Sequence, residues 1–485
     1  MNDSAPQSQR PDPEVPASLD ELQASLQLFL GDSSDVVYRN IAFRRMPGLI
    51  VYIEGMADPR HVIEALLEAK PDEREDSPER PYETIRTGVI TEGQVNETDS
   101  LEEVCGDLLG GATMIYMDGC RSALLVSTKS LKQRAVQEAT SQSVVRGPRE
   151  GFTEDLVDNI ALVRRRIQHP SLRIRKFKIG TKTRTLTAVM YMEGKADPAV
   201  LSELYARLER IKLESVLESS YIEEAIQDER YSPFPTVYNS ERPDVIASAV
   251  LEGRIAILVD GTPFVLVVPA LFVQFFQSSE DYYQRSDFSS MVRLLRYFCF
   301  AISLLTPSVY VAVTTYHQEM IPPPLLISLI GQREGIPFPA FVEALIMEIT
   351  FEVLREAGIR LPKSIGQSVS IVGTLVIGQA AVEAGFISAA MVIVVSLTAI
   401  ANFALPAFNV AISIRMLRFA LMAAAAMFGL FGVMVAMIML ALHLSSLESM
   451  GVPYMSSLAP FKLSRQKDTL LRLPRFLRLR RSGRS

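Results

Sequence analysis

Long apolar segments in the last third of the chain restrict its fold more than any other feature of the sequence. Residues 297–317, 386–406 and 419–444 are mostly apolar. A helix of about 20 residues, rising about 1.5 Å per residue, crosses the hydrocarbon core of a bilayer. Residues 291–444 are therefore predicted to form a transmembrane helical domain. Within the last segment, Gly429 and Gly432 are expected to permit close approach of another helix.

A fourth apolar segment, residues 366–382, differs from the others because one side of its predicted helix is polar. Small and neutral polar side chains recur there at helical spacing, at Gln367, Ser370, Thr374 and Gly378. Two explanations are open. This stripe packs against a neighbouring helix through interhelical hydrogen bonds, or it lines a water-filled ion path.

Acidic side chains recur on one face of a predicted amphipathic helix, residues 338–357. Glu348, Glu352 and Glu356 share this face, and apolar residues occupy the other. The helix is expected to lie at the bilayer interface or to place its acids at the mouth of a cation pore. Residues 321–324 (IPPP) are expected to be non-helical. They would form either a connection at the membrane edge or a short re-entrant piece.

The charges beside the apolar segments give conflicting predictions of topology. The N-terminal half and the arginine-rich tail are both expected in the cytosol, which requires an even number of crossings. The segments 297–317, 366–382, 386–406 and 419–444 provide four. Four crossings, however, place several cations outside, against the positive-inside rule: Arg355, Arg360, Lys363, Arg415 and Arg418. A fifth crossing by residues 338–357 corrects those positions but moves the tail outside.

The first 290 residues contain an internal duplication. Residues 51–59 (VYIEGMADP) recur as 190–198 (MYMEGKADP), and residues 112–119 (ATMIYMDG) match 254–261 (RIAILVDG). Residues 35–41 resemble residues 155–160. Because three blocks recur in the same order, we predict two α/β lobes, residues 31–142 and 143–290, after a disordered tail at 1–30. A basic cytosolic tail is predicted at 445–485.

Each copy has the same predicted order of elements. A buried strand ends at Glu-Gly, and Asp58-Pro59 or Asp197-Pro198 then begins a helix with a capping carboxylate and a proline in its first turn. Helices 101–109 and 243–251 precede strands that turn at Asp-Gly hairpins. The paired acids, including Glu54 and Glu193, are therefore interpreted as turn and cap residues rather than as acid–base catalysts.

Composition and motifs exclude several classes of function. The net charge is −6, but the last 25 residues contain nine Lys or Arg and a single acid, Asp468. Three dispersed cysteines predict free thiols rather than a disulfide framework. The four histidines are dispersed, and no nucleotide-binding, nucleophile-elbow or zinc-protease motif occurs. We expect no enzyme activity, no metal site, no cofactor and no nucleic-acid partner.

Four long stretches resemble the A subunits of the GerA family of spore germinant receptors. They are residues 147–152 (GPREGF), 255–264 (IAILVDGTPF), 355–362 (REAGIRLP) and 370–385 (SIVGTLVIGQAAVEAG). The resemblance covers nearly the whole chain after residue 30. It implies a multi-pass protein of the spore inner membrane, with the lobes and the C-terminal tail facing the spore core.

The resemblance also implies partners and a role. The partners would be a permease-like B subunit, a lipoprotein C subunit, further copies of the chain and membrane lipid. The preferred hypothesis is an oligomeric, nutrient-gated cation channel that releases ions and starts germination, with Gln367, Ser370, Thr374 and Gly378 along the ion path. The alternative is a non-conducting scaffold or signal-transducing subunit of the receptor.

Overall fold

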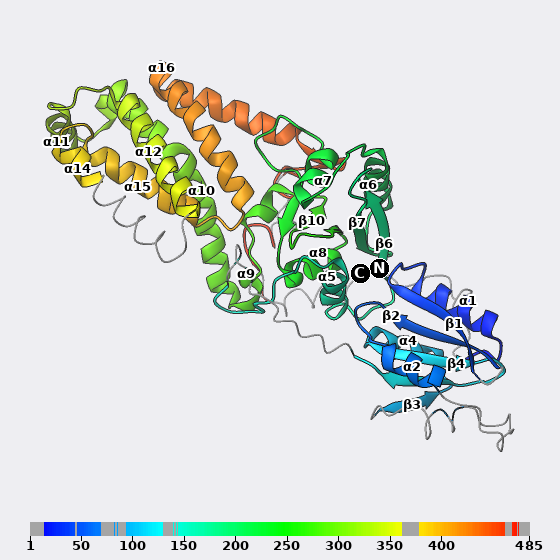
Figure 1. The fold of residues 1–485 in the computed structure, drawn as a ribbon. Coiled ribbons are helices and arrows are strands. Elements are labelled where there is room, and N and C mark those ends of the chain that lie inside the picture. Colours follow the sequence, from blue (N-terminus) through cyan, green and yellow to red (C-terminus); the bar gives the residue numbers. More distant parts are fainter. Residues whose placement is uncertain are drawn as a thin grey trace. The chain divides into compact units, whose positions relative to one another are not determined.

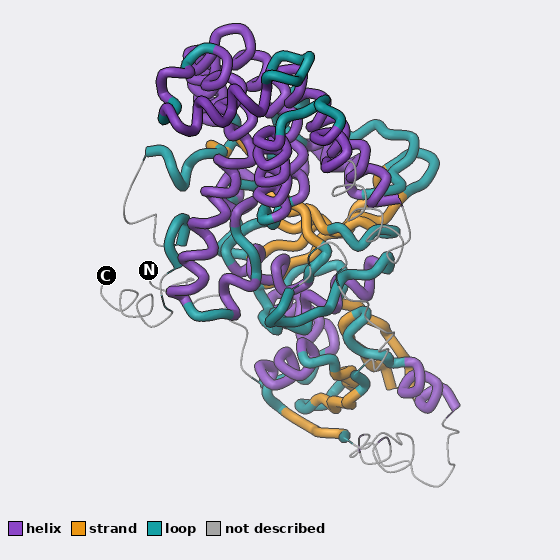
Figure 2. The backbone as a smooth tube through the Cα atoms, turned by 90° about the vertical axis from the view of Figure 1, so that its left-hand side faces the viewer, coloured by secondary structure: helices purple, strands orange, loops and turns teal. Residues whose placement is uncertain are grey.

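The computed structural model describes residues 14–43, 46–68, 82, 85, 94–129, 139, 142, 144–360, 378–460, 468–472 and 474. The chain divides into two compact units (Figure 1). Unit 1 comprises Met1–Gln227 and Val237–Pro269, and unit 2 comprises Asp228–Thr236 and Ala270–Arg484. Both five-stranded sheets belong to unit 1, and unit 2 is mainly helical (Figure 2).

The first lobe of unit 1 is a five-stranded antiparallel sheet with helices on both faces. Its strand order is β1-β2-β4-β5-β3. Leu49 and Val51 of β2 face a core shared with α1 and α4, whereas Ile50 faces a core shared with α2. Alternate residues of β2 are thus buried on opposite faces. The elements are α1 Leu19–Leu30, β1 Val36–Phe43, β2 Met46–Ile53, α2 Arg60–Glu68, β3 Val95–Thr98, α4 Leu101–Leu109, β4 Ala112–Met117 and β5 Ala123–Ser127.

The second lobe repeats this topology with the strand order β6-β7-β9-β10-β8. The matching strand orders confirm the predicted pair of α/β lobes, and α4 and α8 have the predicted bounds. The elements are α5 Leu156–Arg164, β6 Leu172–Ile179, β7 Thr185–Met192, α6 Pro198–Arg210, α7 Ser219–Ile226, β8 Tyr238–Ser240, α8 Pro243–Leu251, β9 Ile255–Val259 and β10 Val265–Val268.

One block of the predicted duplication is wrong. Residues 36–41 belong to strand β1, whereas residues 156–160 begin helix α5. The counterpart of β1 is β6, because Val36 pairs with Ile53 and Leu172 pairs with Met192 at the ends of the matching strands β2 and β7. Short apolar patterns do not distinguish a strand from a helix, which explains the error.

The predicted disordered tail at residues 1–30 is also wrong for residues 19–30, which form α1. Leu22, Leu26 and Leu30 recur every four residues along α1 and are at most 2% exposed. This spacing places one apolar stripe against the sheet core of the first lobe.

The two capping aspartates and the Asp-Gly turns have the predicted roles. The Asp197 carboxylate accepts the Ala199 backbone N–H at 2.9 Å at the start of α6, and Asp58 accepts that of Arg60 at 3.3 Å at the start of α2. Gly119 and Gly261 have φ of 88° and 87° in the Asp-Gly turns between paired strands. A positive φ is a conformation that glycine adopts without strain.

A buried ion pair joins the two lobes within unit 1. Asp35, directly before β1, pairs with Arg164 at the end of α5 at 2.9 Å, and both side chains are at most 2% exposed. The adjacent Ser34 N–H donates to the Ile174 carbonyl on the outer edge of β6 at 2.9 Å.

Unit 2 is built around the long helix α10, Ser286–Thr315, whose ends we call proximal (Ser286) and distal (Thr315). The other main helices are α9 Glu280–Tyr283, α11 Pro323–Arg333, α12 Ala340–Arg360, α14 Gly378–Glu383, α15 Ala389–Phe403 and α16 Phe408–Ser446. Helix α11 begins at Pro323, so the expected non-helical segment at 321–324 is wrong for Pro323 and Pro324. Proline is tolerated in the first turn, where its missing N–H has no intrahelical acceptor.

Two helices in the described part of the chain are long and apolar enough to cross a membrane. They are α10 and α16, with mean hydropathies of 1.7 and 2.4. Helix α15 is apolar but has 15 residues. The predicted segment 366–382 lies outside the described residues up to residue 377.

The predicted single helix at 419–444 is wrong, because α16 turns back on itself at Gly429. Gly429 has φ 60° and ψ −144°, and a Cβ built there would lie 2.7 Å from His317 Cε1, beyond the distal end of α10. On either side of Gly429, Ser413 donates a hydrogen bond to the Pro233 carbonyl, and His443 Nε2 lies 2.9 Å from Ser232 Oγ. Residues 408–428 and 430–446 are therefore two arms of a helical hairpin (Figure 1).

The remaining described helices can be ordered along α10. Val394, early in α15, and Thr314 of α10 line one cavity of about 470 Å³, whereas the end of α15 places Asn402 beside Ser303. Helix α15 thus runs from the distal to the proximal end. Helix α12 runs the same way, because Glu343 near its start binds Ser388 directly before α15, whereas Glu348 later in α12 pairs with Arg418 beside Ser303.

Candidate functional site

The predicted acidic face of α12 contributes a buried carboxylate to the interior of unit 2. Glu348 Oε2 accepts a hydrogen bond from Arg418 of α16 at 2.6 Å, and the two side chains are 1% and 2% exposed. An apolar protein interior stabilises neither charge alone, so each depends on the other. Because this pairing crosses between helices, it sets the position of α12 relative to α16.

Arg418 extends this pairing to two more helices. Its Nε donates to the Ser303 carbonyl at 2.8 Å, and its Nη2 donates to Ser303 Oγ at 3.0 Å. The Ser303 hydroxyl in turn donates to Asn402 Oδ1 at 3.4 Å. The residues Glu348, Arg418, Ser303 and Asn402, here called the four-helix network, thus join α12, α16, α10 and α15.

The other predicted acids of α12 are progressively more exposed. Glu352 pairs with Arg415 at 2.5 Å, with 28% of the glutamate exposed, and Glu356 pairs with Arg360 on its own helix at 2.5 Å, with 61% exposed. Glu348 and Glu352 each retain one buried carboxylate oxygen, Oε1, that has no hydrogen-bond partner among the described residues.

As far as Val353, helix α12 exposes apolar side chains and turns its charged side chains inward. Ile349 and Val353 are 49% and 62% exposed, whereas Glu343 and Glu348 are buried. This is the arrangement typical of a helix in lipid, where ionisable side chains face the bundle interior and pair with one another. Glu343 accepts hydrogen bonds from the Ser388 backbone N–H at 3.2 Å and hydroxyl at 2.9 Å, directly before α15.

Of the four residues predicted along an ion path, only Gly378 lies among the described residues. It is the first residue of α14, it is buried, and its Cβ would lie 3.7 Å from Val392 Cγ1 of α15. Gln367, Ser370 and Thr374 lie outside the described residues.

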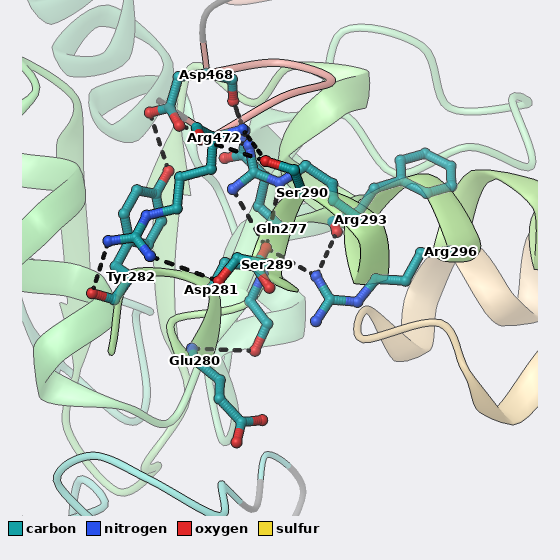
Figure 3. Close-up of polar contacts among 12 residues, drawn as sticks. Gln277, Glu280, Asp281, Tyr282, Ser289, Ser290, Arg293, Arg296, Asp468 and Arg472 are labelled. Atoms are coloured by element: carbon teal, nitrogen blue, oxygen red, sulfur yellow. Dashed lines mark hydrogen bonds and ion pairs between the residues drawn. The ribbon is translucent and has the colours of Figure 1, made fainter. Parts of the chain in front are cut away.

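A second polar cluster lies at the proximal end of α10 (Figure 3). Arg293 and Arg296 of α10 share the carboxylate of Asp281 in α9, at 3.2 and 2.8 Å. Arg293 and Asp281 are at most 2% exposed. Asp468, far away in sequence, also lies 3.4 Å from Arg293. This proximal cluster thus connects the start of α10 to the C-terminal part of the chain.

These two clusters hold helices together, and their chemistry does not suggest a reaction. No group of three or more His, Cys, Asp or Glu side chains within the described ranges is placed to hold a metal ion. Glu348 belongs to the acidic face predicted from the sequence, whereas its pairing with Arg418 was not predicted. The spacing of these charges could have indicated the pairing. Glu348 and Glu352 lie one turn apart on one helix, and Arg415 and Arg418 lie one turn apart on another, so the two helices present faces of opposite charge.

Known proteins resemble this chain over almost its full length. Residues 24–483 match the family described as Bacillus/Clostridium GerA spore germination protein. Spore germination protein KA of Bacillus subtilis (strain 168) is 50% identical over 448 residues, which cover 92% of this chain and 82% of that protein. A protein of the same strain named uncharacterized membrane protein YfkQ is 47% identical over 470 residues, covering 97% and 91%.

A more distant relative and a solved structure also match. Spore germination protein GerLA of Bacillus cereus is 37% identical over 466 residues, covering 95% of this chain and 94% of that protein. The crystal structure of the N-terminal domain of the A subunit of the Bacillus megaterium spore germinant receptor GerK3 matches with 36% identity and a TM-score of 0.44. It covers 55% of this chain and 100% of that chain. The match to the family over residues 24–483 and the identities to the two spore germination proteins KA and GerLA show that the chain belongs to the GerA family of Bacillus and Clostridium spore germination proteins.

Proposed function

We propose that this chain is the A subunit of a nutrient-sensing germinant receptor and that several copies form a nutrient-gated cation channel. Membership of the GerA family supports the role in germination. The relatives' names, which include spore germination proteins and one membrane protein, support the same role at a membrane. A permease-like B subunit and a lipoprotein C subunit are the proposed partners.

The proposed location is the spore inner membrane, crossed six times. Helix α10, helix α12, helix α15 and the two arms of α16 supply five crossings, and the predicted segment 366–382 supplies the sixth. Arg360 ends α12 at the proximal side, and Gly378 begins α14 before the distal start of α15. An even number keeps the lobes and the C-terminal tail on the spore-core side.

Six crossings also remove the conflict with the positive-inside rule. Arg355 and Arg360 at the end of α12, and Arg415 early in α16, belong to the proximal half of unit 2. They then lie toward the spore core, as cations beside membrane helices are expected to do. The hairpin at Gly429 makes this possible without moving the tail outside.

The single observation that supports conduction is the polar stripe Gln367, Ser370, Thr374 and Gly378 on an otherwise apolar segment. Glu348, Glu352 and Glu356 each have an arginine partner. In this proposal they therefore position α12, and they add little charge to a pore mouth. Nutrient binding to a partner subunit shifts a closed–open equilibrium by its different affinity for the two states.

Substitutions in the stripe test this proposal. Thr374→Leu and Ser370→Phe are expected to abolish nutrient-triggered ion release from spores that contain normal amounts of the receptor. Val372→Leu adds one heavy atom away from the stripe, as Thr374→Leu does within it. It is therefore the matched control for Thr374→Leu and is expected to leave release intact. Normal ion release in both stripe variants would show that this segment does not line the ion path.

A flux assay separates the channel from the scaffold alternative. The purified chain in liposomes is expected to conduct monovalent cations, and Thr374→Leu is expected to reduce the flux while Val372→Leu does not. Absence of flux, with assembly of the receptor intact, would favour the non-conducting scaffold.

A further inference from the structure

A short C-terminal segment, Asp468–Arg472, binds the proximal end of α10 through both its backbone and its side chains. The Asp468 carbonyl accepts hydrogen bonds from Arg293 Nη1 at 2.5 Å and from Gln277 Nε2 at 2.9 Å. Its carboxylate accepts a hydrogen bond from the Tyr282 hydroxyl at 3.1 Å. Figure 3 shows these groups converging on Asp468.

Arg472 fixes the other end of this segment. Its Nη1 donates to the Gln284 carbonyl at 2.5 Å and its Nη2 to the Tyr282 carbonyl at 3.1 Å, so the guanidinium group binds the C-terminal end of α9. Its backbone N–H donates to Ser290 Oγ at 3.0 Å in the first turns of α10. Arg472 as a whole is 9% exposed. One chain segment therefore holds α9 and α10 together.

The contact between the C-terminal segment and α10 includes an ion pair. Arg293 and Arg296 share one buried carboxylate, Asp281, and Asp468 supplies a second acid beside Arg293. Asp468 is the only acid among the last 25 residues. Without Asp468 the buried Arg293 loses an acceptor in a place that water does not reach, which is costly.

A movement of the proximal end of α10 can be transmitted to the four-helix network through α10 itself. Helix α10 is held by the C-terminal segment at Ser290 and Arg293, and it contributes Ser303 to the network. A shift of α10 therefore acts on Arg418 and, through its ion pair, on Glu348 of α12. Packed helices with buried ion pairs change between discrete arrangements rather than deforming continuously.

We propose that Asp468–Arg472 is a regulatory strap that holds α10 in the resting position of the receptor. The proposal rests on the function proposed above. Weakening the strap lowers the free energy needed to leave the resting state, so less nutrient suffices to trigger germination. The strap acts on the position of α10 and takes no part in nutrient binding.

The first experiment tests the strap itself in the purified full-length chain. Hydrogen–deuterium exchange of residues 280–296 is expected to become faster in Arg472→Gln and, to a smaller extent, in Gln277→Ala, which removes one hydrogen bond. Arg285→Gln is the matched control, because it removes a charge from the same helix end but from a pair that is 86% and 66% exposed. Unchanged exchange in Arg472→Gln would overturn the strap, whatever the receptor does.

The second experiment tests control of the response in spores in which the unaltered chain supports germination. Arg472→Gln is expected to lower the nutrient concentration for half-maximal germination about three- to tenfold, as expected for the loss of a few hydrogen bonds. Gln277→Ala is expected to shift it less, and Arg285→Gln is expected not to shift it.

Three results would overturn regulation by the strap: an unchanged threshold at normal receptor amounts, a raised threshold, or reduced receptor amounts in both strap variants. The last would mean that the segment only stabilises the fold. Failure of the unaltered chain to support germination would instead contradict the proposed function.

Discussion

At the scale of single residues, the pairing of Glu348 with Arg418 is expected to stabilise unit 2 strongly. Glu348→Ala leaves a buried guanidinium group without its carboxylate, and removing one partner of such a pair costs about 3–5 kcal/mol. Glu356→Ala breaks an exposed pair on one helix, for which about 0.5 kcal/mol or less is expected. Thermal unfolding of the purified chain should therefore show a much lower midpoint for Glu348→Ala. Equal midpoints would mean that the buried pair does not hold α12 in place.

A second residue-scale prediction concerns pH and the second lobe. Burial raises the pKa of Glu223 in α7 to about 7. The folded lobe therefore favours the protonated carboxyl. That contribution to stability is complete below the ordinary glutamate pKa and is lost as pH rises through about 7.

Glu223→Gln keeps a neutral side chain of similar shape and tests this dependence. The variant is expected to match the unaltered chain near pH 4.5 and to unfold at a higher temperature at pH 8, with the difference growing between these values. A thermal midpoint difference that does not change with pH would contradict the raised pKa.

Residue types predicted local contacts better than distant ones. Asp197 and Asp58 could be identified as caps because the capping groups lie two residues away. Arg418 could not be assigned to Glu348, because a partner 70 residues away depends on how α12 and α16 pack. Cys105 is a free thiol, as predicted, and its burial raises its pKa to about 12.

At the scale of elements, Gly429 is expected to be indispensable for the hairpin of α16. Its φ of 60° with ψ of −144° is strained for any side chain, and a Cβ would lie 2.7 Å from His317. Gly429→Ala should therefore lower the thermal midpoint of the chain and reduce receptor amounts. Gly358→Ala is the control, since a Cβ there meets nothing within 4 Å inside α12, and alanine favours a helix. A midpoint for Gly429→Ala at or above that of the control would contradict a required break.

Elements were predictable where a local pattern specified them. Helices α4 and α8 and the Asp-Gly hairpins follow from spacing and turn residues. The hairpin of α16 was missed because its sequence, Phe408–Ser446, is apolar on both sides of Gly429. Apolarity predicts that a segment can cross a membrane but not how often. The glycine break also depends on Tyr316, whose hydroxyl donates to the Ala426 carbonyl at 2.8 Å.

At the scale of the whole molecule, the duplicated lobes and the helical domain followed from the sequence, but the path of the chain through the helices did not. Four crossings place the cations at Arg355, Arg360 and Arg415 on the outer side, against the positive-inside rule. Five crossings place the basic tail there. In the proposed topology, this conflict comes from counting α16 as one crossing and α12 as none. In the proposed six-crossing topology, where α16 crosses as two arms, these cations and the basic tail all lie on the spore-core side, as the positive-inside rule expects.

Cysteine accessibility distinguishes six crossings from four. In a chain whose three cysteines are replaced by alanine, Arg360→Cys lies on the spore-core side if α12 crosses the membrane and on the outer side if it does not. Glu319→Cys is outside and Ser445→Cys inside in both topologies, so they serve as controls. We expect a membrane-impermeant maleimide, added to the outer face of sealed vesicles, to label Glu319→Cys but neither of the other two variants. Labelling of Arg360→Cys from outside, with Ser445→Cys protected, would contradict a crossing by α12 and restore the four-crossing topology.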